Sequence, residues 1–315
     1  MPKIIGFGIV GCGVISRWHA DAIESIQGAK LIGATDPNEE ALKKFTGDYN
    51  IRGYSTLEEM LACDEIDAVS ICTPSGLHAP QAIQAANAGV NVIVEKPMAI
   101  TREEIDAVIE ACEKNDVKLA VVSQLRFSDS VQKVKKAIEN QELGNIVLCD
   151  LYMKYYRSPD YYATSNWRGT WKMDGGGALM NQGIHGVDIL QYIMGPVKSV
   201  FGQVRTLTHD IEVEDTACAI LEFENGALGT IEGTTSVYPG YSRRLEIHGD
   251  QGSIILEEDN IVEWNTVDGE GNEHLTAVSS AEFNSSSDPA AIGKQGHMRQ
   301  LSDFVNAIIE DRAPL

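Results

Sequence analysis

The sequence lacks several features that mark particular protein classes. None of its apolar runs approaches the roughly 18 residues needed to span a bilayer, and the first strand pattern begins by Lys3, which leaves no room for a leader. The six cysteines are scattered without a Cys-x-x-Cys pair, a pattern that favours reduced thiols over disulfides or a zinc site. We therefore expect a cytoplasmic protein with no bound metal.

Basic side chains are also scarce. The 315-residue chain has 25 Lys and Arg against 46 Asp and Glu, which gives a formal net charge of −21. Because this charge repels phosphate at long range, we expect no nucleic-acid partner and no membrane partner. A single small phosphate-bearing ligand held by local backbone groups remains compatible with this charge.

The order of strand and helix patterns divides the chain into two expected domains within an α/β fold class. Over residues 1–123, short apolar strands alternate with helix patterns, which predicts a doubly wound parallel (Rossmann) sheet. Over residues 124–315, long strands separated by turn sequences predict an α+β domain with a large, mostly antiparallel open sheet. A polar loop is expected over residues 279–287 and a last helix over residues 295–311.

A glycine-rich loop follows the first predicted strand. Residues 11–16 (GCGVIS) fit the pattern Gly-x-Gly-x-x-small, in which backbone groups and the next helix N-terminus hold a pyrophosphate. Asp36 ends the next strand, where its carboxylate can accept bonds from ribose hydroxyls and would repel a 2′-phosphate, so NAD is favoured over NADP. The alternative is an ordinary turn with Asp36 as a helix cap. The loop residues expected to bind the dinucleotide are Gly11, Gly13, Val14 and Ile15.

Polar residues follow two further predicted strands. Lys96, after the strand that ends at Val94, can hydrogen-bond a substrate oxygen and help it lose or gain a proton. Carboxyl ends of parallel strands line one crevice, so Thr73, Pro74 and His78 are expected beside the same ligand. The alternative is an exposed lysine, a Thr-Pro turn and a helix-capping histidine.

A second dense segment lies at residues 174–188. Three glycines, Gly175 to Gly177, enter a helix expected over residues 178–194. Asn181, His185 and Asp188 recur at helical spacing and would share one face, and His can act as acid or base near neutral pH. The alternative is a buried histidine satisfied by a neighbour.

Together, the glycine loop, Glu95-Lys96-Pro97 and the Gly-Gly-Gly…Gly-x-His-x-x-Asp segment resemble the Gfo/Idh/MocA oxidoreductase family over essentially the whole chain. The resemblance implies an NAD-dependent dehydrogenase that transfers a hydride between nicotinamide and a hydroxyl or keto carbon of a cyclic polyol, sugar or nucleotide sugar. It implies that Lys96 is the catalytic lysine and His185 the acid/base, with Glu95 and Lys96 near the cofactor. Asn181 stands where many members carry Asp; it cannot take a proton and would orient the substrate.

The same resemblance extends to the second domain, which is expected to bind substrate and to form a homodimer or homotetramer. The stretch Trp167 to Trp171, with residues 181–185, is similar to members that act on nucleotide-linked amino sugars. Family members usually have one more helix than this chain shows. The substrate contacts expected are Arg126, Tyr155, Trp167, Arg168, Asn181 and His185, with Tyr156, Arg157 and Trp171 as further candidates.

Two other functions remain open from the sequence. An NAD-dependent glycoside hydrolase on the same fold would reoxidise its cofactor in each cycle. A dinucleotide-sensing regulator would keep the fold without the chemistry, although the presence of both Lys96 and His185 argues against it.

Overall fold

A computed structural model describes residues 3–164, 166–269, 275 and 294–315. The described residues form two compact units: the first lies within 1–124, 172–175 and 294–315, and the second within 125–171 and 176–275. The loop expected over residues 279–287 lies outside the described residues. Among the helices described, none has the length and apolar character required for a bilayer crossing.

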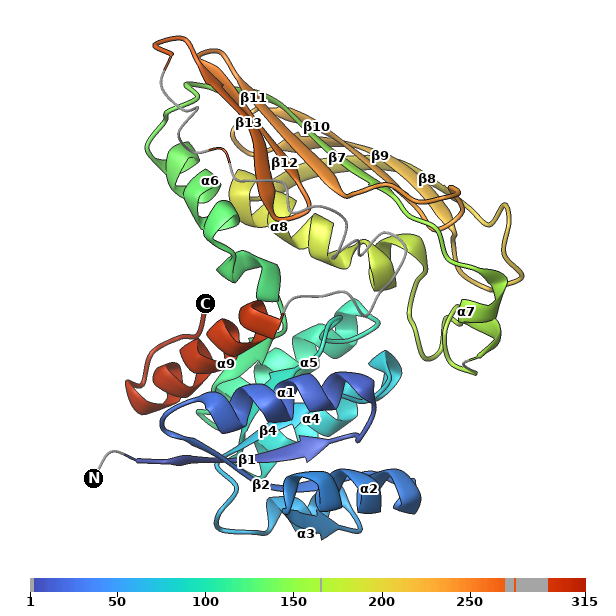
Figure 1. Ribbon diagram of the computed structural model, residues 1–315, viewed down its shortest axis with the longest axis vertical. Coiled ribbons are helices and arrows are strands. Elements are labelled where there is room, and N and C mark those ends of the chain that lie inside the picture. The colour runs from blue at the N-terminus through green and yellow to red at the C-terminus, as the bar shows by residue number, and fades with distance from the viewer. Residues whose placement is uncertain (1–2, 165, 270–274, 276–293) are drawn as a thin grey trace. The chain divides into compact units, whose positions relative to one another are not determined.

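The first unit is built on a six-stranded parallel sheet with the order β3-β2-β1-β4-β5-β6 (Figure 1). Every residue of β1 and β4 is buried, because crossover helices cover both faces of the sheet and such strands can be apolar throughout. This confirms the doubly wound prediction. The strands are β1 (Ile5–Val10), β2 (Ala29–Thr35), β3 (Arg52–Tyr54), β4 (Ala68–Ile71), β5 (Asn91–Val94) and β6 (Leu119–Val121). The helices between them are α1 (Val14–Ser25), α2 (Glu39–Tyr49), α3 (Leu57–Leu61), α4 (His78–Asn87) and α5 (Arg102–Lys114).

The last helix, α9 (Lys294–Ile309), also belongs to the first unit, although the sequence boundary places it in the second domain. Its apolar face completes the core beside α1 and β1, where the Phe304 and Phe7 rings meet edge to face at 6.3 Å. Gln300 fixes it further, since its amide donates to the Val121 carbonyl at 2.7 Å and accepts from the Ser123 N–H at 2.9 Å. A helical pattern shows an apolar face but not which core that face completes, so sequence alone could not place this helix.

The second unit is built on a seven-stranded sheet with the order β13-β12-β11-β7-β10-β9-β8. β7 and β10 run parallel and the remaining neighbours run antiparallel, which confirms the mostly antiparallel prediction. The strands are β7 (Ile146–Lys154), β8 (Val197–Arg205), β9 (Thr216–Phe223), β10 (Leu228–Thr234), β11 (Arg244–Gly249), β12 (Gly252–Glu257) and β13 (Asn260–Thr266). The helices are α6 (Asp129–Glu139), α7 (Pro159–Ala163) and α8 (Ile184–Met194).

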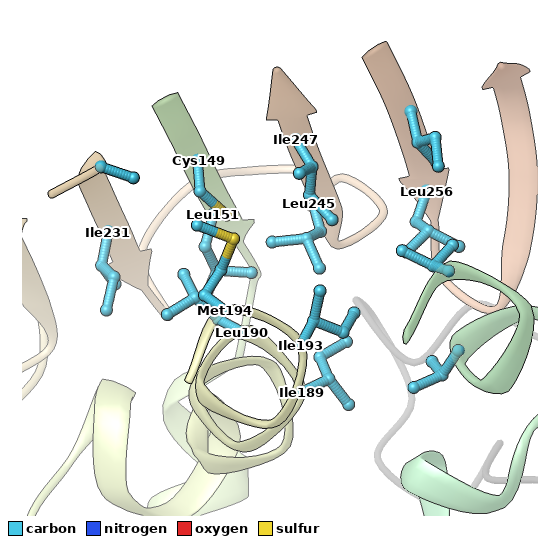
Figure 2. Packing of buried hydrophobic residues seen from close by; sticks show 14 of the residues in the cluster. Cys149, Leu151, Ile189, Leu190, Ile193, Met194, Ile231, Leu245, Ile247 and Leu256 are labelled. Atoms are coloured by element: carbon cyan, nitrogen blue, oxygen red, sulfur yellow. The ribbon is translucent and has the colours of Figure 1, made fainter. Parts of the chain in front are cut away.

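One face of this sheet carries the core of the second unit. Figure 1 shows α6 and α8 on the same side of the sheet, and Figure 2 shows α8 packed against β7, β10, β11 and β12. From α8, Ile189, Leu190 and Ile193 are almost fully buried against Leu151 and Leu245 of the strands. On β9, Leu221 and Phe223 face this core, so Ile220, the residue before Leu221, points to the opposite, exposed face.

Candidate active site

The glycine loop, Asp36, Thr73 and Lys96 all follow strands that end side by side in the first sheet. Val10 at the end of β1 is in register with Thr35 of β2 on one side and Ile71 of β4 on the other. Ile71 is in turn in register with Val94, the last residue of β5. Chain order reverses between β1 and β4, and such a switch point at the carboxyl edge is where doubly wound sheets bind ligands.

The two glycines of the loop meet different constraints. Gly11 has a φ of +92°, and a Cβ there would lie 2.9 Å from Thr73 Cγ2, so this position needs glycine for the protein's own packing. A Cβ on Gly13 would meet no described atom within 4 Å. Gly13 precedes α1, which has neither a side-chain N-cap nor an acidic residue in its first turn. This exposed glycine and the uncapped helix start fit a pyrophosphate group.

Asp36 binds the glycine loop directly. Its carboxylate accepts the Cys12 N–H at 2.7 Å through Oδ2 and the Asn38 N–H at 2.7 Å through Oδ1. A carboxylate has about four acceptor positions, so these two bonds leave capacity for ribose hydroxyls. The Cys12 thiol beside it is inert, because burial and the Asp36 charge raise the pKa of Cys12 to about 12. Asn38, rather than Asp36, caps α2 through its side chain.

Glu95 lies in a buried network that sequence reasoning did not find. Its Oε1 is 2.9 Å from His19 Nε2 on α1 and 3.8 Å from His297 Nε2 on α9, while Oε2 accepts the Lys96 N–H at 3.2 Å. Burial opposes ionisation, but the hydrogen bond from His19 and the two imidazoles outweigh it, so the pKa of Glu95 lies well below its usual range. One oxygen of the glutamate therefore faces the buried imidazoles, and the other faces the Lys96 backbone at the end of β5.

His78 is enclosed by backbone. Nδ1 lies 2.7 Å from the Pro97 carbonyl and Nε2 lies 2.7 Å from the Thr73 carbonyl, and the residue is 1% exposed. Burial lowers the pKa of His78 below its usual value, and the two carbonyl contacts only partly offset this. Near neutral pH the ring is then uncharged and has one N–H for the two carbonyls. The ring therefore donates to one of these two carbonyls at a time, and it is enclosed by the Thr73 and Pro97 backbone and not open to a ligand.

Gly177, the last of the three glycines before the helical segment, is packed against a residue that the sequence did not single out. Glu214 accepts the Gly177 N–H at 2.9 Å and the Leu179 N–H at 3.0 Å, and thereby caps the start of the helical segment. A Cβ on Gly177 would lie 1.8 Å from the Glu214 carbonyl oxygen. Glu214 lies in an acidic loop, and nothing in its local pattern marks it as a cap.

The helix expected over residues 178–194 is not continuous, and this part of the prediction is wrong. A π-helical turn, η3 (Ala178–Gln182), is followed by α8, which begins at Ile184. Gly183 at the junction approaches its neighbours closely, because a Cβ there would lie 3.0 Å from the Ala178 carbonyl oxygen. Asn181 and His185 are both partly exposed but belong to different helical segments, so the regular spacing that was expected to align them does not hold.

Two of the expected substrate contacts have protein partners within the second unit. The Arg126 guanidinium pairs with Asp188 on α8, with Nε 2.9 Å from Oδ2, and lies 5.2 Å from the centre of the Tyr192 ring. Tyr155 is 5% exposed and packs in the core under the sheet.

Three further candidates, Arg157, Trp167 and Arg168, gather around Tyr161. The Arg168 guanidinium stacks on the Tyr161 ring at 4.3 Å, and Trp167 lies beside Arg168 at 5.6 Å. Gln182 links this cluster to the π-helical turn, since its amide nitrogen donates to the Tyr161 hydroxyl at 2.7 Å and its oxygen accepts from Arg157 Nη2 at 2.7 Å. Arginine, tyrosine and amide groups are thus brought next to Asn181. Trp171 is exposed, and Tyr156 packs edge-on against Tyr238 at 5.2 Å.

Each of the two units matches a known protein-family model. A family model described as an oxidoreductase family with an NAD-binding Rossmann fold matches residues 5–123, and a model of the GFO/IDH/MocA C-terminal domain matches residues 131–255. The chain belongs to the Gfo/Idh/MocA oxidoreductase family. The predicted NAD-dependent dehydrogenase is thereby confirmed at the level of this family, with NAD as its cofactor.

Individual relatives cover most of the chain. The oxidoreductase YrbE of Bacillus subtilis is 31% identical over 85% of this chain and 79% of its own length. The myo-inositol 2-dehydrogenase of Thermotoga maritima is 30% identical over 82% of this chain and 77% of its own. Among solved structures, the WlbA dehydrogenase from Bordetella pertussis, in complex with NADH and UDP-GlcNAcA, is 36% identical with a TM-score of 0.86, over 99% of this chain and 90% of that one.

Proposed function

We propose that this Gfo/Idh/MocA dehydrogenase oxidises a hydroxyl group of a nucleotide-linked sugar, within the wider class of cyclic polyols, sugars and nucleotide sugars. The cluster of Tyr161, Arg168 and Gln182 carries this proposal, because a guanidinium and an amide suit the phosphates or carboxylate of such a substrate. Arg157 is buried and contributes by holding the Gln182 amide oxygen. The likeness to the WlbA dehydrogenase, whose structure holds UDP-GlcNAcA, supports the same class.

The proposed chemistry is an oxidation with proton removal by protein groups. Bound NAD supplies the hydride acceptor. As the hydride leaves for the nicotinamide, one of two groups, the Lys96 amine or the His185 imidazole, takes the proton of the substrate hydroxyl, since both group types can act as a base near neutral pH. The Asn181 amide orients the substrate by hydrogen bonding, because a carboxamide is neither an acid nor a base near neutral pH.

The proposed cofactor contacts follow the carboxyl edge of the first sheet. Backbone N–H groups at Gly13, Val14 and Ile15 hold the pyrophosphate, and Gly11 shapes the turn. Asp36 accepts from the adenosine ribose. Thr73, Pro74 and Lys96 adjoin the nicotinamide, while Glu95 and His78 contribute by holding the backbone of that region.

We also place a homo-oligomer interface on the exposed face of the second sheet. Phe201 of β8 and Ile220 of β9 are register partners on that face, and their exposed fractions are 69% and 57%. Such a paired apolar surface is typical of a face covered by another copy. The proposed location is the cytoplasm, in keeping with six unpaired cysteines.

The interface can be tested by mass in solution. Phe201→Glu places a charge on the apolar pair and should reduce the oligomer to monomers in light scattering. Gln191→Glu, which adds the same charge on the exposed side of α8, is the matched control and should leave the mass unchanged. A wild-type monomer, or an unchanged mass for Phe201→Glu, would remove the interface from the proposal.

The substrate class can be tested by NADH formation. Purified protein with NAD is offered UDP-linked sugars and sugar acids, free sugars, and inositols. We expect NADH to form fastest with the nucleotide-linked compounds, and Arg168→Gln to raise their KM more than it lowers kcat. A response to free polyols alone would contradict the nucleotide-sugar assignment, and sugar release without net NADH would indicate glycoside cleavage instead.

A further inference from the structure

Three buried side chains around Glu95 have no part in the chemistry proposed above. His19 lies on α1, Ser70 on β4 and His297 on α9, and each is at most 2% exposed. His19 is bonded through both ring nitrogens, with Nε2 2.9 Å from Glu95 Oε1 and Nδ1 2.7 Å from Ser70 Oγ. The network therefore joins the middle of the sheet to helices near both ends of the sequence.

The protonation of this network follows from Glu95. An ionised carboxylate only accepts hydrogen bonds, so His19 Nε2 must carry the hydrogen that it shares with Glu95. His297 Nε2, at 3.8 Å from the same oxygen, is at ion-pair distance and beyond an ordinary hydrogen bond. The His297 ring is fixed by edge-on packing against Trp18 at 5.7 Å and against His19 at 5.5 Å.

The other carboxylate oxygen of Glu95 points to the backbone of Lys96. Oε2 accepts the Lys96 N–H at 3.2 Å, while on the following residue the Pro97 carbonyl lies 2.7 Å from His78 Nδ1. The chain at Lys96 thus lies between two buried groups, with its own N–H bonded to Glu95 and the next carbonyl in contact with the His78 ring. A carboxylate already bound at Oε1 cannot rotate freely, so the position of Oε2 depends on His19.

We propose that His19, Glu95 and His297 form a positioning network that fixes Lys96 for proton transfer, with α9 as part of the scaffold of the active site. None of the three is a catalytic residue, because each acts on the Lys96 backbone directly or through Glu95. The inference rests on the proposed role of Lys96 in the reaction.

Glu95→Gln tests the network most simply, since it keeps the shape and removes the charge. We expect kcat to fall on the order of 10- to 100-fold, because small displacements of reacting groups lower the rate by this much. KM and the Kd for NAD should stay within about threefold of the wild-type values. Glu110→Gln, an exposed charge removal on α5, is the matched control and should leave kcat unchanged. A role confined to folding would lower Tm and leave the kcat of the folded variant intact.

His19 offers a rescue experiment that does not depend on Glu95→Gln folding. His19→Gln keeps an amide donor for Glu95 and should retain most of kcat, whereas His19→Leu removes the donor and should lower kcat as far as Glu95→Gln does. Equal kcat for His19→Gln and His19→Leu would overturn the network.

Lys96→Ala separates the two claims. If Lys96→Ala is inactive and Glu95→Gln keeps wild-type kcat, the network is wrong and the proposed function stands. If Lys96→Ala itself keeps turnover, Lys96 is not needed for proton transfer. The proposed chemistry is then wrong, and so is the network proposed to position Lys96.

Discussion

The two units present their candidate functional residues in different ways. In the first, Lys96 follows a buried parallel strand, and its backbone is bonded by Glu95 and lies next to Pro97, which His78 holds. In the second, Asn181 and His185 sit on either side of a junction between a π-helical turn and a regular helix. The first site is set by strand register, whereas the second is set by close glycine packing and the Glu214 cap. Positions at strand ends can therefore be anticipated from sequence, but positions on an irregular helix cannot.

The largest expected effect is a loss of stability on substitution of Gly177, which tests whether glycine packing fixes the site in the second unit. In Gly177→Ala the new Cβ would overlap the Glu214 carbonyl oxygen, so the start of the helical segment must shift. We expect a loss of roughly 3 kcal/mol in the free energy of unfolding, at the upper end for overpacking. Urea denaturation measures it, with Gly47→Ala as the control, because a Cβ there meets no described atom within 4 Å. A Gly177→Ala variant as stable as wild type would show that the second site is not fixed by this packing.

A smaller effect is expected for the two glycines of the loop in the first unit, where substitution should affect NAD binding at one and stability at the other. Gly13→Ala should leave the stability of the free protein unchanged and raise the Kd for NAD about 10- to 100-fold, because its methyl group would enter the space of the pyrophosphate. Gly11→Ala should instead lower stability, since Gly11 has a positive φ and lies against Thr73. Calorimetric titration with NAD, beside thermal unfolding, distinguishes them. Unaltered NAD binding by Gly13→Ala would contradict the cofactor assignment at this loop.

The smallest effect concerns acid stability of the first unit. The pKa of Glu95 is lower in the folded protein than its usual value near 4.5, so its contribution is fully present above that pH and is lost as pH falls below it. The difference in Tm between wild type and Glu95→Gln should therefore be largest at neutral pH and shrink below about pH 4.5. A Tm difference that stays constant from pH 7 to pH 3.5 would show that the histidine neighbours do not lower the pKa of Glu95 in the folded protein.

Much of the first unit could be predicted because its determinants are local. The glycine loop, the strand ending before Asp36 and the strand ending before Glu95 each show in a short stretch of sequence, and parallel pairing places them at one edge. The partners of Glu95 could not be predicted, because His19 and His297 are brought together by packing across 278 positions of the chain. His297 lies on α9, whose assignment to the first unit has no local signal.

In the second unit, the sheet could be predicted from the sequence but the local geometry of the candidate site could not. Long strand patterns separated by turn residues predict its sheet, and the Gly-Gly-Gly segment predicts that a helix begins after it. The π-helical turn and the Glu214 cap depend on how closely two backbone segments approach each other. The spacing of apolar residues in the sequence carries no information about this distance. For the same reason Tyr155, chosen for its aromatic ring, is buried in the core, whereas Gln182, which links Arg157 to Tyr161, was not singled out as a substrate contact.

The central claim is that the lysine at the end of β5 transfers the proton in an NAD-dependent oxidation. Single-turnover NADH formation by Lys96→Ala, with a nucleotide-linked sugar as substrate, tests it most directly. We expect a rate lower than wild type on the order of 10²- to 10⁴-fold, with the Kd for NAD nearly unchanged. A rate close to that of wild type, from a variant that binds NAD normally, would contradict it.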